Sequence, residues 1–390
     1  MKLLHTADLH IGMTNYSKFD PESGLESRLV DFFKTFDYII ETAIKQNVDA
    51  FIFAGDAYKS RDPSPTQQKG FGEAVLKLTK AGIPVILVVG NHDTPTAFGK
   101  ANTLDIYSAL EIENVWVARK MELLNIPTKS GNLQVITVPW FHKSELKTIA
   151  EKLSSLYAKI KKPEISGPTI LAGHLEVEGA SMGSEKGLTI GSENTLPLSL
   201  LLDRRLSYVA LGHIHKHQVI ANPTNAGPLV VYCGSPERID FGEEKEEKGF
   251  ILVNIEAGKS VFRFTPSKAR KFITITINLK TDNPDPTQTI LKEIGKHQIK
   301  DSIVKVIINI PDEFPKEIEI DKIKKTLSPA HVIASISKNI ERAERIKIDG
   351  QEEVERLTPI EAMRTYFKSK NYSAEKIKNL EKYAAQILES

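Results

Sequence analysis

An α/β fold is predicted for residues 1–268 by three features of the sequence. Short apolar runs such as Asp49–Ala54 and Pro84–Val89 have the length of strands buried on both faces. A segment with apolar residues at helical spacing, Leu29 to Ile44, precedes them. Polar residues that can bind cations directly follow several of the runs. Strands that alternate with helices favour βαβ crossovers and a largely parallel sheet.

Each predicted strand contains an apolar run that is bounded by turn residues. They are Lys2–Ala7, Asp49–Ala54, Pro84–Val89, Leu133–Pro139, Thr169–Ala172, Ser207–Leu211, Leu229–Tyr232 and Phe250–Ile255. Two helices are predicted between the first three strands. One carries the apolar stripe from Leu29 to Ile44, and the other carries Phe71, Val75 and Leu78.

Residues that can bind a hard or borderline cation follow five of these strands. They are Asp8 and His10, Asp56, Asn91, His174, and His213 with His215. In α/β sheets, ligands bind at the carboxyl ends of the strands. Each residue alone also fits a turn, and the stretch Ala210–His215 alone also fits a solvated turn. Because the pattern recurs at five strand ends, we expect one shared metal site.

Bulk composition fits a protein of two or three domains, each with its own core. The chain has 390 residues and a net charge of only +2, so the overall charge does not indicate nucleic acid binding. The single cysteine, Cys233, excludes an internal disulfide, fits a reducing compartment and lies in an apolar run, where we expect a buried thiol. No apolar stretch approaches the ~18 residues that cross a bilayer. We expect a cytoplasmic protein without membrane contact.

The ordered motifs Asp-x-His, Gly-Asp, Gly-Asn-His-Asp, Gly-His and Gly-His-x-His resemble those of the calcineurin-like metallophosphoesterases. This resemblance implies a four-layer αββα sandwich that holds two divalent ions. By the family pattern, the first ion is held by Asp8, His10, Asp56 and His215, and the second by Asp56, Asn91, His174 and His213. Nitrogen and oxygen donors of this kind suit two Mn²⁺ ions best, with Fe, Co, Zn and Mg as alternatives.

Two further residues directly follow Asn91. His92 should lie beside the metals without binding them, and the resemblance makes it the catalytic acid or an orienting group near the leaving oxygen. Asp93 would fix the orientation of a histidine ring, with a helix or turn cap as the alternative.

The opening segment Leu3 to Gly12, the segment Gly55 to Pro65, and the segment His174 to Ala180, with Gly183-Ser-Glu behind it, resemble the SbcD family. Members of that family are the nuclease subunits of a double-strand-break repair complex. The resemblance implies an exonuclease or endonuclease acting on DNA ends, an SbcC-type coiled-coil ATPase as partner, and a homodimer. The alternatives are a phosphatase or nucleotidase of small phosphoesters, and a non-catalytic ATPase scaffold. The complete ligand set counts against a scaffold.

One position departs from the family pattern. Many members carry a histidine three residues after the bridging aspartate, where this chain has Lys59. Lys59 and Arg61 are candidate contacts to DNA phosphates, because a lysine binds phosphate as a point charge. A solvated loop lysine is the alternative for Lys59. The balance between exonuclease and endonuclease action stays open.

Residues 269–348 have the order strand, helix, strand, helix, strand. The strands are Lys271–Leu279, Ile303–Ile310 and Val332–Ser337, the first helix follows the turn Asn283–Pro286, and a Lys-rich helix spans Asp321–Leu327. A small α+β domain is predicted, in the position of the capping domain that family nucleases use to hold duplex DNA. Its lysines also fit a merely solvated face.

The remaining residues are predicted to form a linker, 349–357, and a helical pair, 358–390. Thr358 to Glu361 form a capping box, Ile360, Met363 and Phe367 share a face, and Ser373 caps a second helix that carries Ile377, Leu380, Ala384 and Ile387. A two-helix unit is too small for its own core, so its apolar stripe needs another surface. The resemblance points to the coiled coil of the ATPase, contacted through residues 358–388. Packing on the rest of the chain is the alternative.

Overall fold

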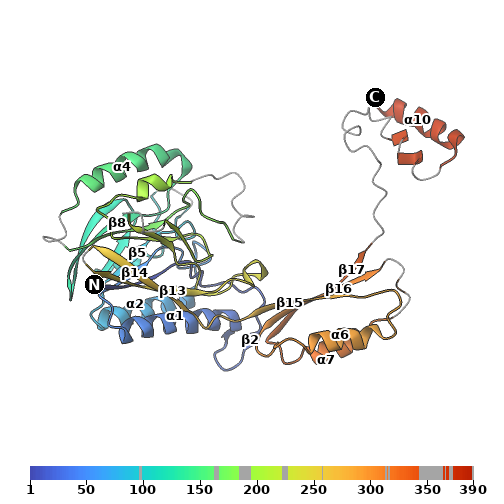
Figure 1. Cartoon of the computed structure of the whole chain (residues 1–390), viewed down its shortest axis with the longest axis horizontal. Helices are drawn as coiled ribbons and strands as arrows, with labels where there is room; N and C mark the ends of the chain where they lie inside the picture. The colour runs from blue at the N-terminus through green and yellow to red at the C-terminus, as the bar shows by residue number, and fades with distance from the viewer. Residues whose placement is uncertain are drawn as a thin grey trace.

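The computed structural model describes residues 1–95, 99–161, 167–183, 195–221, 227–256, 258–311, 314, 317–341, 363–364, 366–368 and 372–388. Two six-stranded sheets lie face to face, with helices on their outer sides (Figure 1). The first sheet has the order β14 (Lys259–Pro266), β13 (Gly249–Glu256), β1 (Lys2–Thr6), β4 (Ala50–Phe53), β5 (Val85–Val88), β6 (Val115–Ala118). The second has the order β11 (Gln218–Ala221), β12 (Leu229–Tyr232), β10 (Tyr208–Gly212), β9 (Thr169–His174), β8 (Gly131–Val138), β7 (Glu122–Thr128).

Three apolar clusters fill the spaces between four layers. The longest helices are α1 (Ser27–Lys45), α2 (Pro65–Lys80) and α4 (Leu146–Ala158), and the short elements of this part are β2 (Phe19–Asp20), β3 (Leu25–Glu26), α3 (Asp105–Ala109), η1 (Lys143–Glu145), η3 (Leu198–Leu201) and η5 (Phe241–Glu243). One cluster joins α1 and α2 to the first sheet, a second lies between the sheets and contains Cys233, and a third joins the second sheet to α4. The predicted αββα sandwich is therefore confirmed.

The strands predicted for the sandwich are present within one or two residues of their expected ends. β1, β4, β5 and β6 pair in parallel, and so do β8, β9, β10 and β12, as expected for strands joined by crossovers. Because parallel strands point the same way, the carboxyl ends of β1, β4 and β5 meet at one edge of the first sheet. The carboxyl ends of β9 and β10 meet at the corresponding edge of the second sheet.

A third sheet follows, with the order β15 (Phe272–Asn278), β16 (Ile303–Pro311), β17 (Val332–Glu341). Helices α6 (Pro286–Ile294) and α7 (Ile320–Thr326) share an apolar core with it. The predicted element order is correct, but the α+β description needs correction because all three strands pair in parallel. Parallel pairing of successive strands requires crossover connections, which α6 and α7 supply, so β15 to β17 form a βαβαβ unit within residues 272–341. We call it the three-stranded unit.

The last described segment contains α10 (Ala374–Leu388), which Figure 1 shows apart from the sheets. The predicted cap is present, since the Lys376 N–H donates to Ser373 Oγ (3.4 Å). Arg364 pairs with Glu381, and the rings of Phe367 and Tyr372 stack, so residues 364–367 contact residues 372–381. The predicted linker 349–357, the capping box 358–361, the side chain of Ile387 and residues 184–185 lie outside the described part. Within that part, no helix combines the length and apolar character needed to cross a membrane.

A buried histidine between the two sheets should make folding sensitive to acid. His5 has no exposed surface, its Nδ1 faces Tyr208 Oη at 3.0 Å, and burial lowers its pKa to about 3. The unfolded chain therefore takes up a proton near pH 6.5 that the folded chain refuses, so stability falls as the pH drops from about 6.5 towards 3. The loss is roughly 1 kcal/mol per pH unit.

Replacement of His5 by Phe should reduce that dependence. We expect the free energy of unfolding of His5→Phe, measured by urea denaturation at pH 7, 6 and 5, to fall by roughly 1 kcal/mol less per pH unit than the wild type. His142→Phe is the control, because His142 is exposed and should leave the slope unchanged. Equal slopes for wild type and His5→Phe would contradict the prediction.

Candidate metal centre

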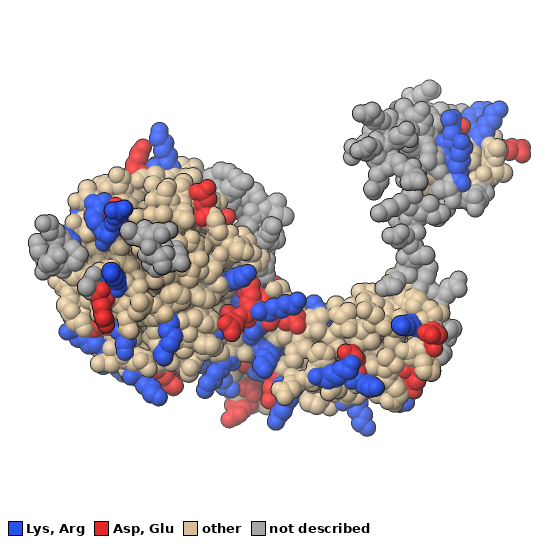
Figure 2. Space-filling view, viewed as in Figure 1, with Lys and Arg blue, Asp and Glu red and all other residues tan. Residues whose placement is uncertain are grey.

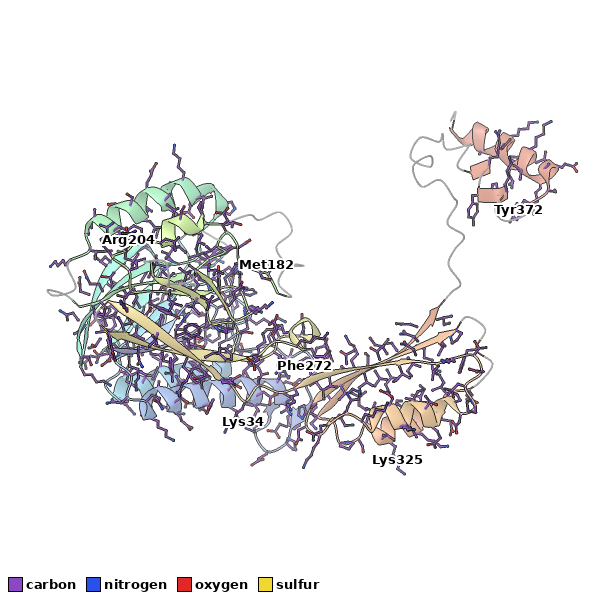
Figure 3. The ribbon with its side chains drawn as sticks, in the orientation of Figure 1. Lys34, Met182, Arg204, Phe272, Lys325 and Tyr372 are labelled. Atoms are coloured by element: carbon purple, nitrogen blue, oxygen red, sulfur yellow. The ribbon has the colours of Figure 1, made fainter. Side chains whose placement is uncertain are left out.

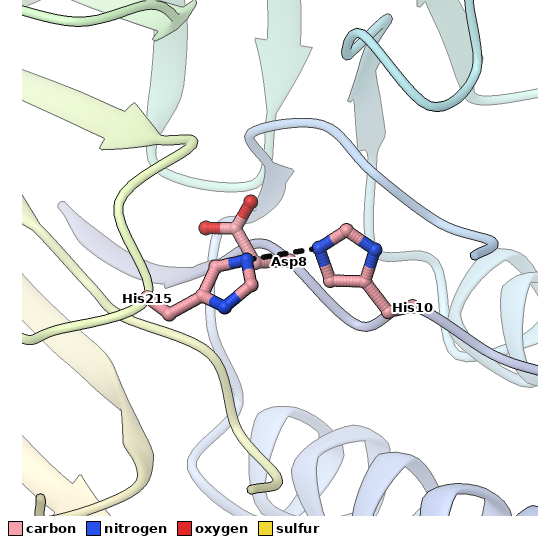
Figure 4. A group of neighbouring side chains, drawn as sticks. All are labelled: Asp8, His10 and His215. Atoms are coloured by element: carbon pink, nitrogen blue, oxygen red, sulfur yellow. Dashed lines mark hydrogen bonds between the residues drawn. The ribbon is translucent and has the colours of Figure 1, made fainter. Parts of the chain in front are cut away.

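The structure brings all seven predicted ligands to one place, where the carboxyl edges of the two sheets face each other. They are Asp8, His10, Asp56, Asn91, His174, His213 and His215. Figure 4 shows three of them, one side chain from the loop after β10 and two from the loop after β1. All except the half-buried Asn91 are buried. A cluster of charged and ring side chains with so little exposed surface needs internal partners.

One half of the cluster contains Asp8, His10 and His215. The Nε2 atoms of His10 and His215 face each other at 3.0 Å (Figure 4). One ligand atom from each of the three residues lies within 4.8 Å of the others. His10 Nε2 also lies 3.6 Å from Asp56 Oδ2.

The other half contains Asn91, His174 and His213. Asn91 Oδ1 lies 2.9 Å from His174 Nε2 and 3.2 Å from His213 Nδ1. His174 Nε2 lies 3.4 Å from Asp56 Oδ2, the same oxygen that faces His10. Asp56 therefore lies between the two halves, in the position that a bridging carboxylate would occupy.

Local backbone geometry makes this convergence possible. Asp8, His10, Asp56 and His213 have positive φ values of 53°, 44°, 59° and 98°, a sparsely populated region that clusters at functional sites. At Gly90 an added Cβ would lie 2.1 Å from Asp56 Oδ1, so only glycine allows β5 to end this close to Asp56.

Hydrogen bonds on the far side of two rings fix which nitrogen faces the cluster. His174 donates from Nδ1 to the Ala54 carbonyl (2.8 Å), and His215 donates from Nδ1 to Glu243 Oε1 (2.8 Å). In a neutral ring each Nε2 is then a lone pair. Ring nitrogens converge here with carboxylate and amide oxygens, and the set holds nitrogen and oxygen but no sulfur. These donors fit divalent transition-metal ions.

The electrostatics of the cluster favour added positive charge. Burial opposes charge on His174, but neighbouring Asp56 outweighs it and raises the His174 pKa to about 9. Burial raises the pKa of Asp8 to about 6 and lowers that of His213 to about 3. Burial also disfavours the Asp56 carboxylate, yet His174 and His10 hold its pKa well below the ordinary value. Without a metal ion, a proton on His174 therefore supplies the positive charge that a bound cation would supply.

Asp93 has a different role from the one expected. Its carboxylate accepts from the backbone N–H groups of Asp56 (2.9 Å), Ala57 (3.1 Å) and Gly90 (2.9 Å). Among the described residues these are its hydrogen-bond donors, and no histidine ring is one of them. The alternative of a turn cap is thus the better description, because Asp93 holds together the loops after β4 and β5.

His92 lies beside the cluster, on a cleft of about 540 Å³. Its backbone N–H donates to Asp56 Oδ1 (2.9 Å), its Nδ1 donates to the Lys59 carbonyl (2.6 Å), and its ring centroid is 4.7 Å from that of His10. Lys59 therefore contacts His92 through its backbone, while its exposed side chain and that of Arg61 line the cleft. His92, His10 and Asp56 also lie close enough together to share an ion.

Three residues at the site escaped the sequence analysis. Glu243 and Lys248, both buried, form an ion pair at 2.8 Å behind His215. The half-buried Trp140 has its ring centroid 5.1 Å from that of His213. Glu243 and Lys248 belong to a charged run that has the pattern of a solvated loop. Trp140 follows β8, and its place directly after a strand was the signal that could have found it.

The fold and the cluster define a class of proteins, the metal-dependent phosphoesterases, and the sequence comparison agrees. The profile of the calcineurin-like phosphoesterases matches residues 1–217, more than half of the chain, and the chain belongs to that family. It is a hydrolase family that binds divalent metal ions.

Within the family, the chain is similar to proteins named for DNA repair. It is 28% identical over 281 residues to the SbcD component of nuclease SbcCD from Escherichia coli, covering 66% of each chain. It is 27% identical over 282 residues to the DNA double-strand break repair protein Mre11 of Sulfurisphaera tokodaii, covering 71% of this chain and 65% of the relative. It is 25% identical over 370 residues to the SbcD component of nuclease SbcCD from Staphylococcus epidermidis, covering 91% of this chain and 92% of the relative. The match thus spans just under two thirds of the first two relatives.

Proposed function

We propose that this chain is a divalent-metal-dependent DNA phosphodiesterase that acts as an exonuclease or endonuclease on DNA ends. The observation that carries the proposal is the two-part cluster joined by Asp56, in a chain whose relatives are named as Mre11 and as the SbcD component of nuclease SbcCD. A non-catalytic scaffold would not need seven converging ligands. A homodimer is part of the same proposal.

In this proposal each half of the cluster holds one ion, with Mn²⁺ the preferred metal. Asp8, His10 and His215 serve one ion, Asn91, His174 and His213 serve the other, and Asp56 serves both. Two such ions, when bound, acidify the attacking water and offset the charge on the phosphate oxygens. The chain's own part is to fix ring orientation, since Ala54 and Glu243 hold His174 and His215 with Nε2 towards the ions.

His92 is proposed as the acid that protonates the leaving oxygen. Because its Nδ1 is committed to the Lys59 carbonyl, Nε2 is the atom left to exchange a proton with a substrate. Lys59 and Arg61 line the same cleft and supply positive charge for a phosphate. The junction between the sandwich and the three-stranded unit adds further cations, since Lys34, Lys268, Lys271 and Lys300 line a groove of about 900 Å³ there. Figure 2 shows lysine and arginine side chains, interspersed with acidic ones, around this junction.

The substrate class can be tested directly. Purified protein with Mn²⁺ should degrade labelled double-stranded DNA and release little phosphate from p-nitrophenyl phosphate in a parallel assay. Chelation of the ions by EDTA should abolish the DNA cleavage, because bound ions activate water and offset the negative charge of the phosphate oxygens. Rapid hydrolysis of the monoester beside intact DNA would overturn the nuclease proposal in favour of a small-substrate phosphatase.

Residues 358–388 are proposed to bind an SbcC-type coiled-coil ATPase. Ile377 on α10 is buried, whereas Tyr372, just before the helix, and Tyr383 within it are exposed, and exposed tyrosines favour a protein contact. A chain that ends at residue 354 should lose co-purification with the ATPase and keep Mn²⁺-dependent cleavage of single-stranded DNA. Unchanged co-purification after this deletion would assign the helices to another role.

A further inference from the structure

The short helix η5 connects the candidate metal centre to the three-stranded unit. On one side, the buried Glu243 accepts from His215 Nδ1 (2.8 Å). On the other side, the next residue, Glu244, accepts from the N–H (2.8 Å) and the hydroxyl (2.5 Å) of Thr274 on β15. Of these two successive carboxylates, Glu243 thus contacts a predicted metal ligand and Glu244 contacts the three-stranded unit.

Glu243 is held firmly in this position. Its second oxygen accepts from the Ile239 N–H (2.9 Å) and pairs with Lys248 Nζ (2.8 Å). Lys248 Nζ also donates to the His215 carbonyl (3.2 Å) and to Ser235 Oγ (2.9 Å). The backbone and the ring of His215 are therefore fixed by the same buried pair, so that a shift of η5 must move or turn the ring.

Aromatic packing joins η5 rigidly to β15. The Phe241 ring lies 5.0 Å from that of Phe272, the first residue of β15, and both contact Tyr16. Lys305 Nζ lies 4.3 Å from the Phe241 ring. Figure 3 labels Phe272 where the three-stranded sheet meets the sandwich. Movement of that sheet would carry η5 with it.

A second contact between the same two parts lies on α1 and avoids the metal centre. Arg270 forms an ion pair with Asp31 (2.5 Å), and His331 Nε2 lies 2.8 Å from Ser27 Oγ. These bonds hold the three-stranded unit without touching a predicted ligand. The structure therefore provides a matched control for the η5 contact.

We propose that Glu243 is a positioning residue that presents His215 Nε2 to the first ion, and that Glu244 makes this presentation depend on the placement of the three-stranded unit. A partner or a DNA duplex that displaces the unit would thereby weaken or strengthen ion binding at His215. The inference rests on the proposed metal-dependent function. A carboxylate behind a ligating histidine raises its basicity and sets its orientation, and its loss weakens metal affinity ~10–100-fold.

Titration with Mn²⁺ tests the proposal without DNA. We expect Glu243→Gln to weaken binding of one of two ions by ~10–100-fold. Glu244→Ala should act in the same direction by a smaller factor, keep the thermal unfolding temperature, and lower kcat without raising KM for DNA. His331→Ala, which removes the contact to Ser27 on α1, should leave Mn²⁺ affinity and kcat at wild-type values.

Two results would overturn the proposal. One is wild-type Mn²⁺ affinity and kcat in Glu244→Ala, and the other is an equal loss in Glu244→Ala and His331→Ala, which would indicate general loosening of the unit. If Glu243→Gln fails to fold because the buried Lys248 keeps only Glu246 as an ion-pair partner, the half-exposed Glu244 decides the question. A wild-type chain that binds two ions and leaves DNA intact would overturn the nuclease function but not this coupling.

Discussion

Replacement of Asp56 by Asn is expected to remove both divalent ions and lower DNA cleavage by about 10³-fold, equivalent to roughly 4 kcal/mol of transition-state stabilisation. One oxygen of Asp56 faces His10 and His174, so its charge serves both halves of the cluster. The amide keeps the shape and can still accept from the His92 N–H. Metal content, measured by plasma mass spectrometry after gel filtration, should fall from two ions per chain to nearly none.

A second buried aspartate offers the control. Asp49 immediately precedes β4, the strand that Asp56 follows, so it lies at the end of β4 away from the cluster. It accepts hydrogen bonds from the Lys2 N–H (2.6 Å) and the Ser130 hydroxyl (2.7 Å). Asp49→Asn should keep two ions and full activity even where it costs some stability. If Asp56→Asn still carries two ions, the carboxylate does not bridge them and each half must be complete without it.

The strands that carry the site were predictable because each is a local signal. β4, β5, β9 and β10 are buried on both faces, so each appears in the sequence as a nearly unbroken apolar run followed by its polar residue. Four strands of the two six-stranded sheets were not predicted, and they are the edges of those sheets: β6, β7, β11 and β14. Edge strands are half exposed, and the sequence of β14 alternates apolar and polar residues only weakly.

Contacts that join distant segments were not predictable in the same way. Glu243 and Lys248 have no apolar neighbours that mark them as buried, and their burial depends on η5 folding against the loop after β10. Asp93 illustrates the same limit, because its sequence position suggested a partner for a ring whereas its three donors are backbone N–H groups. The sequence identifies residues whose chemistry suits a metal site. Which partner each of these side chains contacts depends on tertiary packing.

Replacement of His92 by Ala is expected to lower kcat on DNA by ~10²–10⁴-fold and leave two ions bound. The bond that ties this position to Asp56 comes from the His92 backbone, so truncation of the ring should not disturb the bridging carboxylate. Lys59→Ala is the matched variant, because it keeps the carbonyl that orients the ring and removes only the exposed cation. It should raise KM for DNA and leave kcat near the wild-type value. Loss of an ion in His92→Ala would instead make His92 a ligand, as its closeness to His10 and Asp56 allows.

The leaving group separates acid catalysis from positioning. Protonation by His92 matters when the departing alkoxide of a nucleotide is a strong base, and it matters little when the leaving group is stable as an anion. On bis-p-nitrophenyl phosphate, a diester with such a leaving group, His92→Ala should therefore recover most of the wild-type rate. If His92 only oriented the phosphate, its removal would lower the rate by the same factor on both diesters. Equal losses on DNA and on this diester would place His92 among the groups that hold the substrate, with the leaving oxygen protonated by water.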